Sequence, residues 1–99
     1  MHLKVMTPAR LYVDEVVEFV TIPTKMGQVT ALPGHDFVIT VLKEGKLYFN
    51  KRKGEKPHRE DYLIVGDGCA EITNDEVMVF TKSVKREEVL NGDGKDTAW

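Results

Sequence analysis

The stretch Phe-Val-Ile-Thr-Val-Leu at residues 37–42, followed by Lys-Glu-Gly at 43–45 and Lys-Leu-Tyr-Phe-Asn at 46–50, decides the fold class. Both short runs are rich in Val, Ile, Phe and Tyr, as strands are, and the second run, together with residues 62–65 beyond a polar tip, has the pattern of a long β-hairpin. The first run is apolar at consecutive positions. We therefore expect both of its faces to be covered and the strand to lie centrally in a sheet.

The same pattern continues toward the N-terminus. Residues 2–6 alternate between apolar and polar side chains, as a strand with one buried face does. Residues 11–22 indicate one longer strand, in which the doubled Val16-Val17 suggests a bulge or a shift of the buried face and after which Pro23 ends the run. In Leu32-Pro33-Gly34-His35, the Pro-Gly pair fits the two central positions of a type II turn.

Toward the C-terminus, a polar tip at 51–60 leads to three further strand-like runs at residues 62–65, 69–72 and 77–80. The first two are joined by Gly66-Asp67-Gly68, which we interpret as a tight turn. Short strands at such close spacing predict an all-β fold, a flattened antiparallel sandwich or barrel of about 8–10 strands.

The strand pattern predicts one domain over residues 1–83. Residues 84–99 form a short C-terminal segment that we expect to be partly helical or disordered. Only residues 84–90 have a helical pattern, and Asn91-Gly92-Asp93-Gly94 would end such a helix.

The length and composition of the chain limit its possible functions. A chain of 99 residues has the length for one compact core. Its 14 Lys and Arg against 16 Asp and Glu give a net charge of −2, which predicts no overall attraction to nucleic acid or anionic lipid. The single cysteine, Cys69, cannot form an internal disulfide; we expect it to fill a small core or edge position in a reducing compartment. No run approaches the roughly 20 apolar residues of a membrane-spanning helix, and no signal peptide is recognisable.

No catalytic, cofactor-binding or metal-binding motif is visible. The glycine turn at 66–68 lacks the third glycine and the lysine of a phosphate-binding loop. His2, His35 and His58 are not spaced to ligate one metal, and no histidine is placed beside Cys69 or Ser83 to activate a nucleophile. These observations favour a binding function over an enzyme.

One local basic cluster runs from Lys51 to Arg59 and is interrupted by Glu55. It is typical of a solvated hairpin tip. The alternative function is a free-standing β-sandwich module that binds a small ligand or an acidic polymer through this basic hairpin.

The turn Leu32-Pro33-Gly34-His35, preceded by the turn at Gly27 and followed by a strand ending in Lys43-Glu44-Gly45, resembles the ε subunit family of F-type ATP synthases. Val65-Gly66-Asp67-Gly68 and Glu71-Ile72 match further motifs in the same order. The resemblance implies a β-sandwich of about ten strands. The family's two C-terminal helices, which inhibit ATP hydrolysis, have no room after Leu90, so we expect a short form without that activity.

The resemblance also implies a function. It predicts a non-catalytic rotor subunit of the central stalk, which links the γ subunit to the membrane c ring and couples ion translocation to ATP synthesis without a cofactor. Membrane association would be indirect, at the cytoplasmic face of the cell membrane. The positions implied to contact γ are Thr7, His35, Val38 and Thr40. Those implied to contact the c ring are Met26, Gly27, Gln28 and Val29, with glutamine where an acidic residue is common. Such a role requires an exposed apolar patch.

Overall fold

The computed structural model describes residues 1–34, 36–50 and 62–85. These residues form ten strands, and none of them lies in a helix that could cross a membrane. The strands are β1 (His2–Met6), β2 (Leu11–Val16), β3 (Val20–Thr24), β4 (Gly27–Ala31), β5 (Val38–Leu42), β6 (Gly45–Phe49), β7 (Tyr62–Val65), β8 (Gly68–Ile72), β9 (Glu76–Thr81) and β10 (Val84–Lys85).

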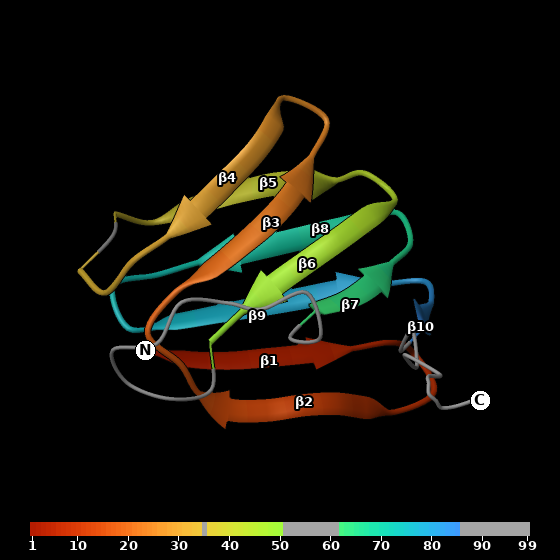
Figure 1. Cartoon of the computed structure of the whole chain (residues 1–99), viewed down its shortest axis with the longest axis horizontal. Coiled ribbons are helices and arrows are strands. Elements are labelled where there is room, and N and C mark those ends of the chain that lie inside the picture. Colours follow the sequence, from red (N-terminus) through yellow and green to blue (C-terminus); the bar gives the residue numbers. More distant parts are fainter. Residues whose placement is uncertain (35, 51–61, 86–99) are drawn as a thin grey trace, which may run out of the picture.

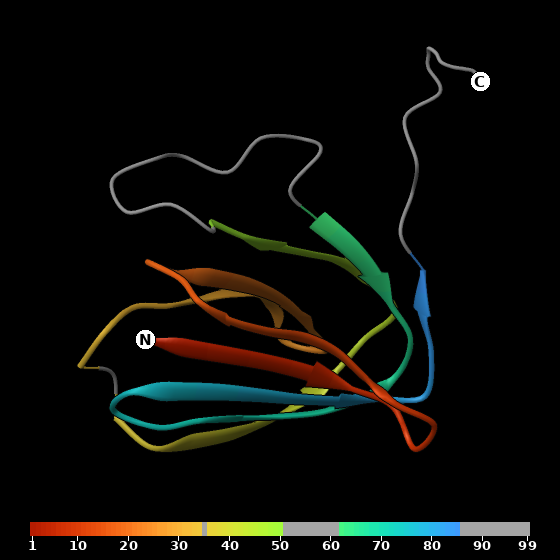
Figure 2. The same ribbon diagram turned by 90° about the horizontal axis from the view of Figure 1, so that it is seen from below.

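The strands form one continuous hydrogen-bonded path that folds into two layers (Figures 1 and 2). We call β4-β3-β6-β7-β10 the front sheet and β5-β8-β9-β1-β2 the back sheet. The two sheets are joined where Thr24 of β3 pairs with Leu42 of β5. All strand pairs are antiparallel except β1 with β9. The predicted antiparallel sandwich is therefore confirmed, with one parallel pair.

The core lies between the two sheets and is built from the inward side chains of alternating strand positions. Full burial of one Val, Leu or Ile side chain contributes roughly 1.5–3 kcal/mol to the free energy of unfolding. The buried hydrophobic residues are Leu3, Val5, Val13, Val17, Val20, Ile22, Ala31, Leu42, Leu47, Phe49, Leu63, Val65, Ala70, Ile72, Val77 and Val79.

The single strand predicted over residues 11–22 is wrong. The run is divided between β2 of the back sheet and β3 of the front sheet, and the chain crosses between the layers at residues 17–19. Val17 is buried at this crossing, and its amide donates a hydrogen bond to the carbonyl of Met1 at 2.9 Å. The doubled valine thus marks a change of layer: Val16 is 70% exposed at the end of β2, whereas Val17 is buried at the crossing.

The sequence predicts that Pro23 ends a strand, and this prediction is wrong. Pro23 lies inside β3, opposite Gln28 of β4. On its other side, β3 pairs with β6 at Val20 and Thr21 and with β5 only at Thr24, so no ladder partner there requires the N–H that proline lacks. Its carbonyl accepts a hydrogen bond from the amide of Lys43 at 3.1 Å.

Strand β5 is not covered on both faces. Ile39 and Val41 are 63% and 54% exposed, whereas Leu42 is fully buried. The consecutive apolar residues therefore belong to two different surfaces, the core and the outside of the back sheet. Cys69, expected as a small core or edge residue, is exposed on β8, between β5 and β9.

The helix predicted over residues 84–90 does not begin where expected. Val84 and Lys85 form β10 and pair with Val65 and Ile64 of β7. Residues 86–90 lie outside the described residues, as does the basic cluster from Lys51 to Arg59. The expected type II turn agrees with the backbone, because Gly34 has a φ of 84°.

Candidate interaction surfaces

The outer face of the back sheet carries a row of apolar side chains. Strand register places Val41 opposite Cys69, Cys69 opposite Phe80, Phe80 beside Met6, and Met6 opposite Leu11. We call these five residues the apolar row. At about 4.8 Å between neighbouring strands, it crosses the five strands over roughly 19 Å. Val41, Phe80 and Leu11 are 54%, 38% and 46% exposed.

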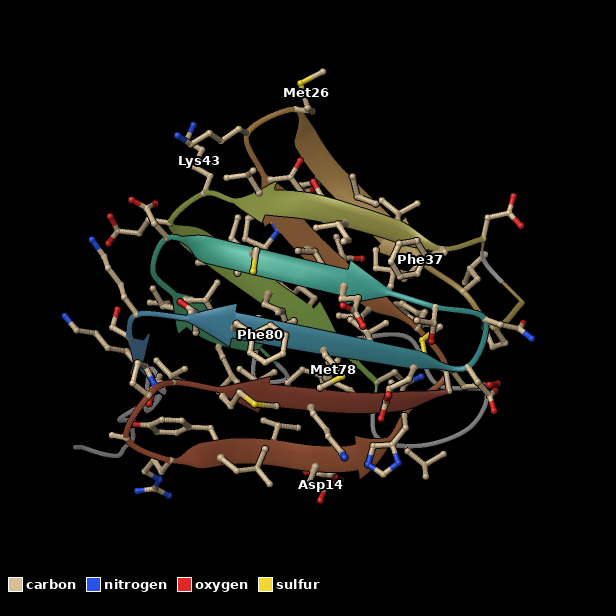
Figure 3. The ribbon with its side chains drawn as sticks, turned by 180° about the vertical axis from the view of Figure 1, so that it is seen from behind. Asp14, Met26, Phe37, Lys43, Met78 and Phe80 are labelled. Carbon is tan, nitrogen blue, oxygen red and sulfur yellow. The ribbon has the colours of Figure 1, made fainter. Side chains whose placement is uncertain are left out.

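Beside the apolar row, the same face mixes apolar and charged side chains. The next row across the strands begins with the exposed Ile39 on β5 and continues through Glu71 on β8 and Met78 on β9. On β1, the ammonium of Lys4 lies 3.8 Å from a carboxylate oxygen of Glu76. Figure 3 shows Met78 and Phe80 on this outward face, with Phe37 just before the first residue of β5. An apolar row with a charged border is typical of a protein-binding surface.

The apolar row opens into a groove of about 440 Å³ beside the β1–β2 turn. Met6, Pro8 and Phe80 supply its apolar surface. The polar groups at its rim already have partners. The hydroxyl of Thr7 accepts hydrogen bonds from the amides of residues 9 and 10 at 3.2 and 3.3 Å, and the Lys82 ammonium lies 3.9 Å from the Asp67 carboxylate. The groove therefore favours an uncharged, apolar occupant.

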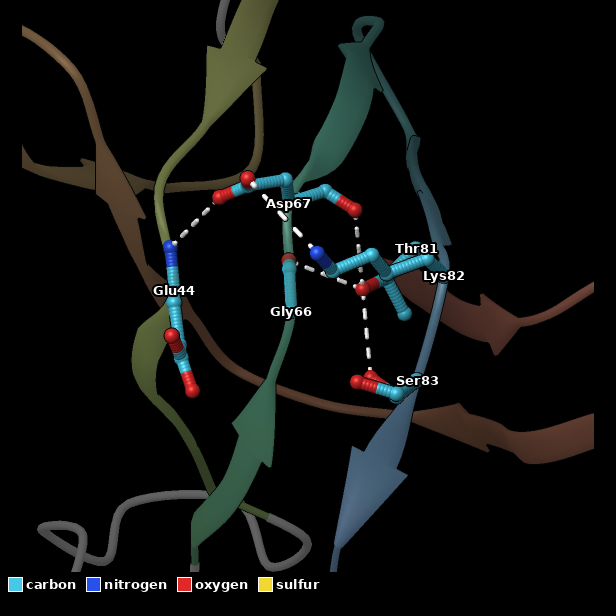
Figure 4. A network of polar contacts seen from close by, with 6 residues as sticks. All are labelled: Glu44, Gly66, Asp67, Thr81, Lys82 and Ser83. Carbon is cyan, nitrogen blue, oxygen red and sulfur yellow. Dashed lines mark hydrogen bonds and ion pairs between the residues drawn. The ribbon is translucent and has the colours of Figure 1, made fainter.

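The glycines at 66 and 68 allow the β7–β8 turn to approach β9 closely. A Cβ at Gly68 would lie 2.0 Å from the carbonyl oxygen of Phe80, and one at Gly66 would lie 2.6 Å from the Ser83 hydroxyl. Below the turn, the buried Thr81 hydroxyl donates to the carbonyl of Gly66 at 2.8 Å (Figure 4). A short turn does join the two runs, but it is not a hairpin turn: Gly66 and Asp67 carry the chain from β7 in the front sheet to β8 in the back sheet, which begins at Gly68. Its glycines serve close backbone packing rather than phosphate binding.

The residues assigned to the c ring by resemblance form the β3–β4 hairpin tip. Met26 is 92% exposed, Gly27 has a φ of 107°, Gln28 is exposed and Val29 is half-buried. The Thr24 hydroxyl donates to the Gly27 carbonyl at 2.6 Å and accepts from the Met26 amide at 3.1 Å. This hydroxyl closes the tip, and Gly27 supplies the left-handed backbone that the turn needs.

The residues assigned to γ do not share one surface. Thr7 lies in the β1–β2 turn at the groove, whereas Val38 and Thr40 are half-buried on the Leu42 side of β5. Val38 packs against the core. His35 lies outside the described residues.

Sequence reasoning missed the exposed side of β5, at Ile39 and Val41. The sequence of β5 alone could not reveal it, because both of its faces are apolar. A signal lay in β8, where Cys69 and Glu71 alternate with the buried Ala70 and Ile72. Pairing β5 with β8 in register assigns Ile39 and Val41 to the outside, next to Glu71 and Cys69.

Among the described residues, no group of three or more His, Cys, Asp or Glu side chains is placed to hold a metal ion. The nearest approach to such a group is the contact between His2 and Asp14 on neighbouring strands. The described surface therefore offers apolar and hydrogen-bonding contacts.

Comparison with known proteins identifies the family. The profile of the ATP synthase Delta/Epsilon chain, beta-sandwich domain, matches residues 1–87. The ATP synthase epsilon chain of Nitratidesulfovibrio vulgaris (strain DSM 19637 / Miyazaki F) is 34% identical over 91 residues, which cover 92% of this chain and 64% of the relative. The ATP synthase epsilon chain of Desulfosudis oleivorans is also 34% identical over 91 residues, covering 92% and 65%. The chain thus spans just under two thirds of the length of these relatives.

Solved structures agree on the fold. A chain in the cryo-EM structure of the Euglena gracilis mitochondrial ATP synthase, in its OSCP/F1/c-ring part, has a TM-score of 0.76 and 23% identity over 92% of this chain and 56% of that chain. A chain from the central stalk and c ring of the Tetrahymena thermophila mitochondrial enzyme has a TM-score of 0.65 and 13% identity, over 84% and 63%. By its sequence match over residues 1–87 and its two-layered sandwich, this chain belongs to the ATP synthase delta/epsilon family.

Proposed function

We propose that this chain is a non-catalytic rotor subunit of an F-type ATP synthase, which joins the γ subunit to the membrane c ring and couples ion translocation to ATP synthesis. Family membership and relatives named ATP synthase epsilon chain support this role. The observation that carries it is the apolar row on the back sheet.

The apolar row lies outside the hydrophobic core. A two-layered sandwich is stabilised by its inner faces, and its outer faces are ordinarily polar. Here Val41 is 54% exposed in the same row as Phe80, and Ile39, in the next row, is 63% exposed. A specific interface buries about 800 Å² on each partner, with an apolar centre and a polar border. The outer face of the back sheet, with its apolar row and charged border, has this composition.

We assign the back face to γ and the hairpin tip to the c ring. Thr7, which the family resemblance places near γ, lines the groove at the end of the apolar row. The tip projects from the sandwich and presents Met26 and Gln28, which suits contact with the polar loops of a c ring. The chain would then be held at the cytoplasmic face of the membrane through its partners.

Co-purification tests this function. The tagged chain is added to detergent-solubilised membranes from its own source, and the proteins that elute with it at moderate salt are identified. We expect γ and c-ring subunits. Ile39→Asp and Val41→Asp should each lower the recovery of γ about tenfold or more, because a buried apolar contact is replaced by an unpaired charge.

The matched control is Thr30→Asp, which places the same charge on an exposed position of the front sheet. It should leave γ recovery unchanged. Recovery of neither partner by the folded wild-type chain would reject the rotor function and redirect attention to ligands of the basic cluster from Lys51 to Arg59. Equal losses with all three variants would reject the back face as the γ contact.

A further inference from the structure

Asp67 joins three separate turns at one end of the sandwich. One oxygen of its carboxylate accepts a hydrogen bond from the amide of Glu44, in the β5–β6 turn, at 3.2 Å. The other oxygen lies 3.9 Å from the ammonium of Lys82, in the β9–β10 turn. Its backbone carbonyl accepts from the Lys82 amide at 3.0 Å (Figure 4). A single residue of the β7–β8 turn therefore contacts both neighbouring turns.

The base of this connection is fixed by close packing. Gly68 lies so near β9 that an added Cβ would meet the carbonyl oxygen of Phe80 at 2.0 Å, which leaves the turn no room to move toward β9. The Thr81 hydroxyl is a further anchor, within 2.8 Å of the Gly66 carbonyl and 3.3 Å of the Asp67 carbonyl. The backbone of Asp67 is thus held by the back sheet while its side chain reaches toward β5.

From Glu44 the connection continues to the hairpin tip. In the same β5–β6 turn, the amide of Lys43 donates to the carbonyl of Pro23 at 3.1 Å. The amide of Lys25, at the tip, donates to the carbonyl of Val41 at 3.2 Å. Pro23 and Lys25 are therefore hydrogen-bonded to the end of β5 and to the β5–β6 turn, which Asp67 contacts through the amide of Glu44.

Asp67 also borders the groove of the back face. Together with Lys82 it forms the polar rim of the hollow whose apolar walls are Met6, Pro8 and Phe80. One side chain is accordingly shared between the edge of the proposed γ surface and the support of the proposed c-ring tip.

We propose that Asp67 is a positioning residue that fixes the hairpin tip relative to the groove, so that contact with the c ring and contact with γ are held in a constant geometry. This inference rests on the rotor function for its purpose, but its structural content concerns this chain alone. A rotor element has to transmit displacement from one surface to another, and a tip tied to the opposite sheet moves with that sheet.

Amide hydrogen exchange of the whole chain tests the structural part. In Asp67→Ala, the Glu44 amide loses its acceptor and should exchange about 3- to 10-fold faster, the effect of removing one hydrogen bond. The amides of Lys43 and Lys25 should accelerate about 2- to 5-fold. Asp67→Asn keeps a side-chain oxygen acceptor and should restore exchange at Glu44 to within about twofold of wild type.

The matched control is Asp75→Ala, which removes an aspartate from the β8–β9 turn at the opposite end of the back sheet. It should leave the exchange of Glu44, Lys43 and Lys25 unchanged. If Glu44 alone accelerates in Asp67→Ala, the contact is local and the positioning role is overturned. Equal acceleration of the Glu44 amide in Asp67→Asn and Asp67→Ala would overturn that role as well.

Co-purification then separates this inference from the rotor function. We expect Asp67→Ala to lose about two thirds of the c ring on washing, and Asp67→Asn to behave as wild type. Wild-type recovery of both partners by Asp67→Ala would overturn the positioning role and leave the rotor function intact. Failure of the wild-type chain to recover γ or c ring would overturn the rotor function, while the exchange results stand.

Discussion

The outer faces of the two sheets differ in how their side chains are partnered. On the front sheet, the hydroxyls of Thr21 and Thr30 are hydrogen-bonded at 3.0 Å, the rings of Tyr48 and Tyr62 are 5.5 Å apart, and the ammonium of Lys46 lies 4.8 Å from the Tyr62 ring centre. The back sheet has the Lys4–Glu76 ion pair on its outer face, but its apolar row exposes aliphatic and aromatic carbon. The side chains of this row gain little from one another and much from a second apolar surface.

This difference separates stability from binding. The front face contributes contacts within the chain, whereas the apolar row of the back face is available to another protein. The inner faces of both sheets supply the core. Substitutions in the core, on the outer face of the front sheet and in the apolar row should therefore differ in their effects on stability and on binding.

The largest contrast is predicted between two adjacent residues of β5. Leu42 is fully buried and Val41 is 54% exposed. Leu42→Ala should lower the free energy of unfolding by about 2–5 kcal/mol, because it removes buried contacts and leaves a cavity. Val41→Ala should change it by less than about 0.5 kcal/mol. Urea denaturation followed by circular dichroism measures both; equal losses would show that β5 is covered on both faces after all.

A somewhat smaller loss of stability is predicted for a substitution at the β7–β8 turn. Gly68→Ala places a Cβ 2.0 Å from the Phe80 carbonyl oxygen, so β8 and β9 must separate. Overpacking of this kind costs about 1–3 kcal/mol, which denaturation midpoints will report. The control is Ser83→Ala, a substitution beside the same turn that adds no atoms. A Gly68→Ala chain as stable as wild type would mean that the turn is not packed tightly against β9.

Much of the fold was predictable from the sequence because strand position depends on local composition. Glycine, asparagine and aspartate mark the turns at 66–67 and 74–75, and β-branched residues mark the strands. The change of layer at 17–19 was predictable only in part, because the doubled valine indicates a bulge or a shift of the buried face but does not show that the chain crosses to the other sheet. The continuation of β3 through Pro23 depends on which strand lies alongside, which local sequence does not contain.

The candidate surfaces were predictable only in part. Residues 26–29, assigned by resemblance, do gather at one exposed tip. Val38 and Thr40 were assigned to γ but share the Leu42 side of β5, because the register of a strand determines which alternate residues face outward. The network around Asp67 joins residues that are 23 positions apart, at Glu44, and 15 positions apart, between Gly66 and Thr81, so no local pattern could have indicated it.

A binding effect of intermediate size is predicted at the groove. Phe80→Ala removes an aromatic wall of the hollow and should weaken binding to γ about tenfold, or about 1.4 kcal/mol, as truncation of a central interface residue does. Titration of purified γ, followed by calorimetry, gives the affinity. Tyr48→Ala, an aromatic truncation on the front sheet, should leave that affinity unchanged. A larger loss from Tyr48→Ala would place the γ contact on the front sheet.

The smallest effect is predicted for the front face, and it tests whether that face is partnered within the chain. In a double-mutant cycle of Thr21→Val and Thr30→Val, the coupling free energy should be about 0.2–1 kcal/mol, as for other cross-strand threonine pairs. Val keeps the shape and β-branching of Thr, so the cycle isolates the hydrogen bond between the two hydroxyls at 3.0 Å. Neither variant should change affinity for γ. A coupling near zero together with lost γ affinity would mean that these hydroxyls bind a partner, and the contrast between the two sheets would then fail.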